Sequence, residues 1–140
     1  MKYLLDTCVL SELVRTVPDA SVLRWTEARK PGELFISTMT LAELLRGVGR
    51  LPRSRRRSEL AQWLKQLEVG FEDRILPFDE AAAQAWAEMT VHAESRGKTM
   101  TAFDAIIAAT ARAHGCRLVT RNVRDFAHAG IDWLNPWESA

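Results

Sequence analysis

The sequence predicts an α/β fold in which a mostly parallel sheet of four or five strands is covered by helices on both faces. Short apolar segments alternate with longer segments whose apolar residues recur at helical spacing. Capping and turn residues, chiefly Asp, Thr, Gly and Pro, separate these segments. The chain contains no repeat, low-complexity tract or linker, so we expect residues 1–140 to form a single domain.

In the first half of the chain, residues 2–5 are apolar and stop at Asp6, which is typical of a short buried strand. Apolar residues then follow at helical spacing until Pro18, and the same order begins again after the turn at 30–32. The predicted elements are a strand at 2–5, a helix at 7–14, a short helix capped by Asp19 or Ser21, a strand at 34–37, a helix capped by Thr38 or Thr40, and a helix at 55–67.

In the second half, glycines mark the helix ends, because Gly readily adopts the left-handed conformation that follows a last helical turn. The predicted elements are a strand at 74–78, a helix capped by Asp79 that ends near Gly97, a helix at 102–114 capped by Thr101, a strand at 117–120, a turn at 123–126 and an edge strand at 131–134. Trp25, Trp63 and Trp86 occupy apolar helical positions and are expected in the core.

Four acidic residues lie where this topology predicts one edge of the sheet. Asp6 follows the first strand, Glu43 lies in the first turn after the second, and Asp125 follows the fourth. Asp104 begins the helix that leads into the fourth strand. Right-handed crossovers place the carboxyl ends of parallel strands at a single edge, so these carboxylates are expected to converge.

Converging carboxylates predict a site for a hard cation. Two carboxylates about 5 Å apart repel by roughly 3 kcal/mol at an effective dielectric near 20, and a divalent cation relieves that repulsion. Oxygen ligands favour Mg²⁺ or Mn²⁺ over zinc, and the three histidines show no zinc-binding spacing. A site of this kind indicates phosphoryl-transfer chemistry.

Two of the acids also have structural interpretations as helix-capping residues. Asp6 could cap the helix that begins at residue 7. Glu43 stands three residues after Thr40, which is the spacing of a capping box. Capping and metal binding are compatible for Asp6, whereas the pattern around Glu43, taken alone, favours a structural role.

The other two acids differ in how readily a structural role explains them. Asp104 has capping-box spacing from Thr101, but its neighbours at i+3, i+4 and i+7 are apolar, and a carboxylate on an apolar stripe is costly without a partner. Asp125 could instead be a turn residue. Asn122, three residues earlier, could supply a neutral oxygen ligand in its place.

Composition excludes several other classes of protein. The net charge is +1, so the chain is not a polycation, and the arginine cluster at 50–57 could be either a phosphate-binding surface or a solvated turn. Cys8 and Cys116 form no CxxC pattern and are expected to be reduced core residues. No segment is apolar enough for a signal peptide or a membrane span, so we expect a soluble, cytoplasmic protein.

The acidic motifs together resemble the PIN-domain ribonucleases of the VapC/FitB toxin type. The resemblance covers the whole chain in order and is carried by LLDTCVLSEL at 4–13, TLAEL at 40–44, DAIIAATA at 104–111, LVTRN at 118–122 and DF at 125–126. RILPFD at 74–79 and NPW at 135–137 are similar to the FitB branch.

The resemblance implies a three-layer α/β/α PIN-like fold and Mg²⁺- or Mn²⁺-dependent endoribonuclease activity, as the toxin of a type II toxin–antitoxin pair. It further implies a homodimer, and a small antitoxin that blocks the site and binds operator DNA. Asp6, Glu43 and Asp104 match the family's three principal acids. Several relatives carry aspartate directly after the Thr-Arg pair, where this chain has Asn122, so either Asp125 or Asn122 completes the site.

From this resemblance we expect Asp6, Asp104 and the fourth ligand to hold the metal, with Glu43 positioning the metal or a bound water. Thr120 and Asn122 are expected to orient the ligands from behind. Arg46 and Arg50 follow Glu43 at helical spacing, so they are expected to hold RNA phosphates.

Two other classes of protein share part of this sequence pattern. An aspartate-phosphorylating α/β protein needs a neighbouring acid or an Asp-x-Asp motif at the first strand, and Asp6 is followed by Thr7 and Cys8. A non-catalytic PIN scaffold that only dimerises or binds a partner would not need the three principal acids that this chain has.

Overall fold

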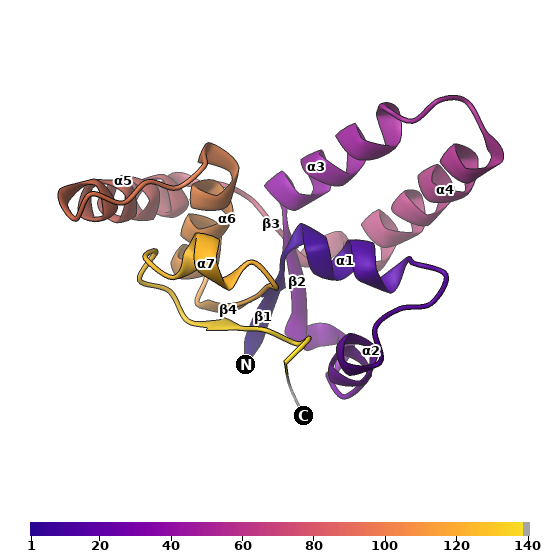
Figure 1. The fold of residues 1–140 in the computed structure, drawn as a ribbon, viewed down its shortest axis with the longest axis horizontal. Helices are drawn as coiled ribbons and strands as arrows, with labels where there is room; N and C mark the ends of the chain where they lie inside the picture. Colours follow the sequence, from indigo (N-terminus) through magenta and orange to yellow (C-terminus); the bar gives the residue numbers. More distant parts are fainter. Residues whose placement is uncertain (139–140) are drawn as a thin grey trace.

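The computed structural model describes residues 1–138 and shows a three-layer α/β/α arrangement around a five-stranded sheet (Figure 1). All strand pairs are parallel, and the strand order is β3-β2-β1-β4-β5. The elements are β1 (Lys2–Leu5), α1 (Thr7–Leu13), α2 (Ala20–Glu27), η1 (Pro31–Glu33), β2 (Leu34–Ser37), α3 (Thr38–Gly49), α4 (Arg55–Gly70), η2 (Glu72–Arg74), β3 (Ile75–Leu76), α5 (Glu80–Ser95), α6 (Ala102–Ala113), β4 (Cys116–Val119), α7 (Val123–Phe126) and β5 (Trp133–Leu134).

Alternation along the central strand β1 creates the two cores of the molecule. Tyr3 and Leu5 point into a cluster built with α1, α2, α3 and α4, whereas Leu4 points into a cluster built with α5 and α6. Successive side chains of a strand face opposite sides of the sheet, so a strand that is apolar throughout requires helices on both faces. Figure 1 shows α5 and α6 on one side of the sheet and α1 and α2 on the other. The predicted fold class is confirmed.

The two edge strands are shorter than predicted. The predicted strand at 74–78 is reduced to Ile75–Leu76, because Arg74 ends a 3₁₀ turn and Pro77 has no amide hydrogen to extend the ladder. The predicted strand at 131–134 is reduced to Trp133–Leu134. The predicted turn at 123–126 is the single-turn helix α7.

Prediction of the tryptophan environments was wrong for Trp86. Trp25 is buried and Trp63 packs against the core, but Trp86 is 39% exposed. Helix α5 packs against α6 through a narrow stripe of small residues and one methionine, and Trp86 lies beside that stripe. No helix within residues 1–138 is long and apolar enough to cross a membrane.

Candidate active site

The site lies at the carboxyl ends of β1, β2 and β4, as the topology predicts. The amide of Asp6 donates to the carbonyl of Val119 at 2.9 Å, which joins the end of β1 to the end of β4. Ser37 ends β2 and also caps α3, and its hydroxyl accepts a hydrogen bond from the Thr40 amide at 3.0 Å. These strand ends therefore fix the starting points of the elements that carry the acids.

Asp6 is the most constrained carboxylate of the site, with only 4% of its surface exposed. Its Oδ1 accepts from the Thr7 amide at 2.8 Å, and its Oδ2 accepts from the Thr120 hydroxyl at 2.7 Å. The Cys8 thiol lies 3.7 Å from the same Oδ2. Burial raises the pKa of Asp6; the Thr120, Thr7 and Cys8 hydrogen bonds oppose that rise, and the charge of Asp125 adds to it.

Asp6 is the N-cap of α1, so the capping role expected from the sequence is present, and it leaves the second carboxylate oxygen available for another role. Capping uses one carboxylate oxygen, and the other is held by Thr120 from behind. Within residues 1–138 no Lys, Arg or His forms an ion pair with Asp6. The protein thus orients this buried carboxylate without neutralising it.

Glu43 is half-buried on α3 and is not part of a capping box. Ser37 is the N-cap of α3, so Thr40 occupies the third helical position and Glu43 lies almost a full turn further on. Its Oε1 instead accepts from the Thr7 hydroxyl at 2.8 Å. Burial raises the pKa of Glu43, the Thr7 hydrogen bond opposes the rise, and the charges of Asp6 and Asp104 add to it.

Asp104 lies in the first turn of α6, with its amide donating to the Thr101 hydroxyl at 3.2 Å. Burial raises the pKa of Asp104, Thr101 opposes the rise, and the charges of Asp125 and Asp6 add to it. The side chain is only partly buried, so it lies at the margin of the apolar stripe rather than within it.

The two candidates for the fourth ligand, Asp125 and Asn122, have different surroundings in the structure. The exposed Asp125 is close enough to raise the pKa of both Asp6 and Asp104. Asn122 donates its backbone amide to the Thr120 hydroxyl oxygen at 3.0 Å, and its side chain forms no cap on α7. Asn122 therefore supports Thr120 through its backbone, whereas Asp125 belongs to the mutually interacting acids.

The donor set fits a hard cation that keeps part of its water shell. The pKa values of Asp6, Glu43 and Asp104 are raised, and in each case the charge of at least one other acid of the site contributes to the rise. The site therefore carries uncompensated negative charge. Among the described residues, no three His, Cys, Asp or Glu side chains are grouped closely enough to hold a metal ion by themselves. Mg²⁺ commonly binds through one or two carboxylates together with water and substrate phosphate, so an open set of oxygens suits it.

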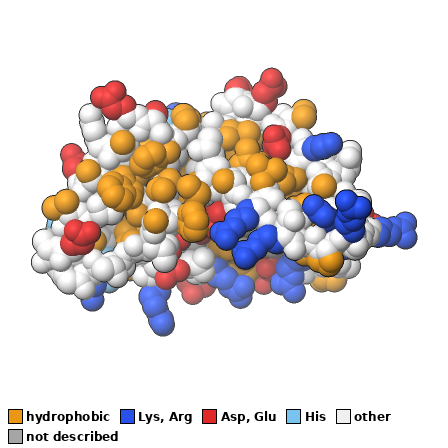
Figure 2. All heavy atoms as spheres, turned by 90° about the horizontal axis from the view of Figure 1, so that it is seen from above, with side chains coloured by type: hydrophobic (Ala, Val, Ile, Leu, Met, Phe, Trp, Pro, Cys, Tyr) orange, Lys and Arg blue, Asp and Glu red, His pale blue; other side chains and the backbone are white. Residues whose placement is uncertain are grey.

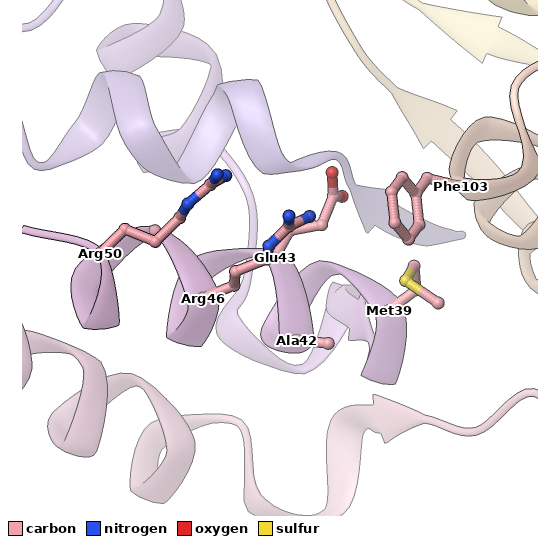
Figure 3. A pocket seen from close by; sticks show the side chains of 7 residues that line it. Met39, Ala42, Glu43, Arg46, Arg50 and Phe103 are labelled. Carbon is pink, nitrogen blue, oxygen red and sulfur yellow. The ribbon is translucent and has the colours of Figure 1, made fainter.

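Three of the pockets are lined by acids of the site, and two of them bear on the predicted residues. One, of about 230 Å³, contains Glu43, Arg46 and Arg50, and Figure 3 shows these three side chains in succession along one face of α3. The other, of about 130 Å³, contains Asp104 and Asp125 and is further lined by Thr99, Met100, Thr101, Arg124 and His128. Arg46 and Arg50 therefore line the same pocket as Glu43, and their contact with RNA phosphates stays a prediction.

Sequence reasoning missed three side chains at this site. Thr7 contacts both Asp6 and Glu43, and the signal was its position directly after Asp6. Cys8, expected in the core, is only partly shielded, and its pKa is raised to about 11, first by burial and then by Asp6. Phe103 lines the pocket beside Glu43, opposite the apolar stripe of its helix.

Known proteins match this chain over nearly its whole length and nearly the whole of theirs. The chain is 39% identical over 137 residues to a VapC ribonuclease of Sinorhizobium fredii, covering 97% of this chain and 98% of the relative. It is 37% identical over 135 residues to the toxin FitB of Neisseria gonorrhoeae, covering 96% and 97%. The FitAcB crystal structure from Neisseria gonorrhoeae matches with a TM-score of 0.93 at 36% identity, covering 98% and 99%.

A FitAB structure bound to a DNA fragment matches equally well, with a TM-score of 0.93 at 34% identity and coverage of 99% and 97%. Residues 3–131 match the PIN domain family. That match spans β1 to α7 and includes all four acids of the site. The chain therefore belongs to the PIN domain family.

Proposed function

We propose that this protein is a divalent-metal-dependent endoribonuclease and the toxin of a type II toxin–antitoxin pair. One observation carries the proposal: the carboxylate of Asp6 is buried and hydrogen-bonded, has no cationic partner within residues 1–138, and interacts electrostatically with three further acids at the carboxyl edge of a PIN sheet. The relatives named as ribonucleases and toxins support the same activity.

In this proposal Asp6, Asp104 and Asp125 hold Mg²⁺ or Mn²⁺, and Glu43 positions the metal or a water beside it. The bound metal supplies an activated water and neutralises charge at the scissile phosphate. Thr7 and Thr120 hold Asp6 in one orientation, which removes a reorientation cost when substrate binds. Arg46 and Arg50 hold phosphates on the α3 side of the acids.

The partners in this proposal are an RNA substrate, a second copy of the chain and a small antitoxin that blocks the site and binds operator DNA. One solved relative is described as a toxin–antitoxin complex, and others, FitAB and VapBC2, are described as bound to DNA fragments. A mainly apolar groove of about 320 Å³ between α1, α3 and α4 begins at Thr7 and Glu43. This groove supports the antitoxin because a peptide lying in it would reach the acids.

A nuclease assay on RNA, with and without Mg²⁺ or Mn²⁺, tests the activity. We expect the wild type to cleave RNA only with metal and Asp6→Asn to lose that cleavage. Equal activity of the two proteins would identify a contaminant or another site.

Growth upon expression, with and without the neighbouring antitoxin gene, tests the toxin role separately. Unimpaired growth with active protein would contradict it.

A further inference from the structure

The segment after β5 returns to the part of the chain that supports Asp6. Asn135 accepts a hydrogen bond from the Trp137 amide through its Oδ1 at 2.9 Å, and its carbonyl accepts from the Glu138 amide at 3.2 Å. These bonds close a tight turn around Pro136, which is buried. The Trp137 ring packs against the core cluster built with α1, α2, α3 and α4. The NPW motif, which the proposed metal chemistry does not use, is therefore anchored in the fold.

The Trp137 ring contacts the side chain of Arg121. The guanidinium carbon of Arg121 lies 4.9 Å from the ring centroid, within the roughly 6 Å of a cation–π contact. Arg121 is otherwise exposed, and no carboxylate within residues 1–138 forms an ion pair with it. The ring is therefore the contact that restrains this arginine.

Arg121 stands in the middle of the loop after β4, which holds Asp6. Thr120, directly before it, donates its hydroxyl to the Oδ2 of Asp6 at 2.7 Å. Asn122, directly after it, donates its backbone amide to the Thr120 hydroxyl oxygen at 3.0 Å. The Thr120 amide donates to the carbonyl of Leu134 on β5 at 2.9 Å. The C-terminal segment thus contacts this loop twice, at the backbone of Thr120 and at the side chain of Arg121.

The indole nitrogen of Trp137 contributes nothing to this contact. Its Nε1 is buried and has no hydrogen-bond partner within residues 1–138. A buried N–H without an acceptor lowers stability, so the aromatic face, rather than the donor, explains a large ring at this position. Phenylalanine would keep an aromatic face and remove the unsatisfied donor, which makes Trp137→Phe a matched variant.

We propose that Trp137 and Arg121 are positioning residues, which fix the loop after β4 so that Thr120 holds Asp6 in its metal-binding orientation. The Thr120 hydroxyl has a single proton, so it orients Asp6 only while the backbone on both sides of it stays in place. Leu134 holds one side through its carbonyl, and Trp137 holds the other through Arg121. The inference rests on the proposed metal binding by Asp6 and adds a support from a distant segment.

Binding of a partner is the competing role, because arginines and aromatic rings are also common at interfaces. Figure 2 shows apolar side chains across the middle of one face and basic side chains mostly over its α3 and α4 half. That face is the upper side of Figure 1, whereas β5 and the residues after it run along the lower side. The Trp137 ring already has an occupant within the chain, Arg121, which favours the internal role.

The first test is made without metal on Trp137→Leu, Trp137→Phe and Arg121→Gln. Trp133→Leu is the control, because Trp133 is a 36% exposed tryptophan of β5 whose ring is not the one beneath Arg121. Amide exchange followed by NMR reports how often the Asn122 amide leaves Thr120. We expect about 2–5-fold faster exchange in Trp137→Leu and Arg121→Gln, the ratio for one exposed cation–π contact. Trp137→Phe and Trp133→Leu should exchange like the wild type.

Calorimetric titration of Mn²⁺ connects the stack to Asp6. Trp137→Leu and Arg121→Gln should bind Mn²⁺ about 2–5-fold more weakly than the wild type. Loss of a positive charge near the acids would by itself strengthen cation binding, so weaker binding in Arg121→Gln cannot be a charge effect. In a Thr120→Val background, Trp137→Leu should weaken Mn²⁺ binding no further, because the support acts through Thr120.

Three results would overturn the inference. One is wild-type exchange and Mn²⁺ affinity in Arg121→Gln, since this exposed residue can be replaced without unfolding the chain. Another is an equal loss of Mn²⁺ affinity from Trp137→Leu with and without Thr120. The third is lost RNA or antitoxin binding with unchanged exchange at Asn122. If the wild type itself does not bind Mn²⁺, the proposed metal site fails, and the exchange still decides whether the stack fixes the loop.

Discussion

The two ends of helix α1 carry two buried carboxylates in opposite electrostatic situations. Asp6, before the helix, is 4% exposed, and Glu12, in its last turn, is 5% exposed. Glu12 accepts from the Asp19 amide at 2.9 Å and from Arg15 at 3.2 Å, and the Asp19 amide is the main cause of its lowered pKa. Asp6 accepts hydrogen bonds but forms no ion pair with a residue of the described part of the chain, and burial raises its pKa.

Under the proposed function, this contrast separates a structural acid from a metal-binding one more clearly than burial does. A buried charge that the chain itself compensates needs nothing from outside. A buried charge that is oriented but not compensated favours the binding of a cation, because the cation removes the repulsion of the neighbouring acids. Glu12 is of the first kind and Asp6 of the second.

The largest expected effect comes from Asp6→Asn. We expect kcat/KM on RNA to fall by about 10³-fold or more, because the variant loses a charged metal ligand. In metal-free buffer, its unfolding free energy should equal or exceed that of the wild type, because one of the mutually repelling charges is gone. Activity and urea denaturation are measured on the same preparations.

Glu12→Gln is the matched control for that experiment. It removes a charge of the same sign and similar burial, at the other end of the same helix. We expect near wild-type activity and a melting temperature lower by about 3–6 °C, since the Asp19 amide and Arg15 lose a charged acceptor. If Glu12→Gln abolishes cleavage and Asp6→Asn only destabilises, the contrast is wrong.

A smaller effect is expected from Thr120→Val, which keeps the buried shape but removes the 2.7 Å donor to Asp6. Loss of a residue that orients a metal ligand typically costs about 10–100-fold in activity or metal affinity. The Mn²⁺ concentration for half-maximal cleavage should rise, and Thr120→Ser should restore it. A Thr120→Val enzyme with unchanged metal dependence would show that Asp6 needs no support from β4.

A still smaller effect is expected from the pair Arg46→Gln and Arg50→Gln. Together they should raise KM several-fold, leave kcat near wild type and reduce the salt dependence of RNA binding by about 1.4 in logarithmic slope. Arg53→Gln with Arg57→Gln is the control, because it removes one exposed and one half-buried charge that do not line the pocket of Glu43, Arg46 and Arg50. Equal changes in both pairs would mean that only overall charge matters.

The smallest effect concerns the pH dependence of stability without metal. The folded pKa values of Asp6, Glu43 and Asp104 are raised above 3.8 or 4.5, so the folded state holds protons that the unfolded state releases. Their contribution is full below these ordinary values and declines as pH rises through the folded values. Glu12 behaves oppositely, since its lowered pKa gives stability above 4.5 that is lost on acidification.

We therefore expect Asp6→Asn to reduce the loss of stability above pH 4 and Glu12→Gln to reduce the loss on the acid side. Denaturation curves across pH check both signs. If the unfolding free energies of Asp6→Asn and Glu12→Gln changed in the same way with pH, the contrast between Asp6 and Glu12 would be wrong.

Metal binding adds a further difference between the wild type and Asp6→Asn. Mg²⁺ at about 100 times its Kd for the wild type should stabilise the wild type by about 2.7 kcal/mol and Asp6→Asn by much less.

The parallel sheet was predictable because strands such as 2–5 are apolar throughout and stop at a polar residue. The convergence of the acids followed from parallel topology alone. The roles of Glu43 and Asp125 did not, because a capping-box spacing and a turn are equally compatible with the local sequence. Only the Ser37 cap and the approach of Asp125 to Asp6 distinguish them.

Contacts between distant segments could not be predicted from the sequence either, because local spacing says nothing about partners that are far apart along the chain. Thr7 and Glu43 are 36 residues apart, and Asp6 and Thr120 are 114 apart, so no local spacing connects them. Trp86 and Phe103 are 39% and 46% exposed although both lie on helices that pack against the core. Helical periodicity identifies an apolar position but does not say whether a neighbour is present.

Calorimetric titration of Mn²⁺ into the wild type, Asp6→Asn and Glu12→Gln tests the central claim most directly. The wild type and Glu12→Gln should bind Mn²⁺ with the same affinity and release similar heat. Asp6→Asn should bind at least about tenfold more weakly, since it loses a charged ligand. Equal Mn²⁺ affinity in all three proteins would contradict a metal site centred on Asp6.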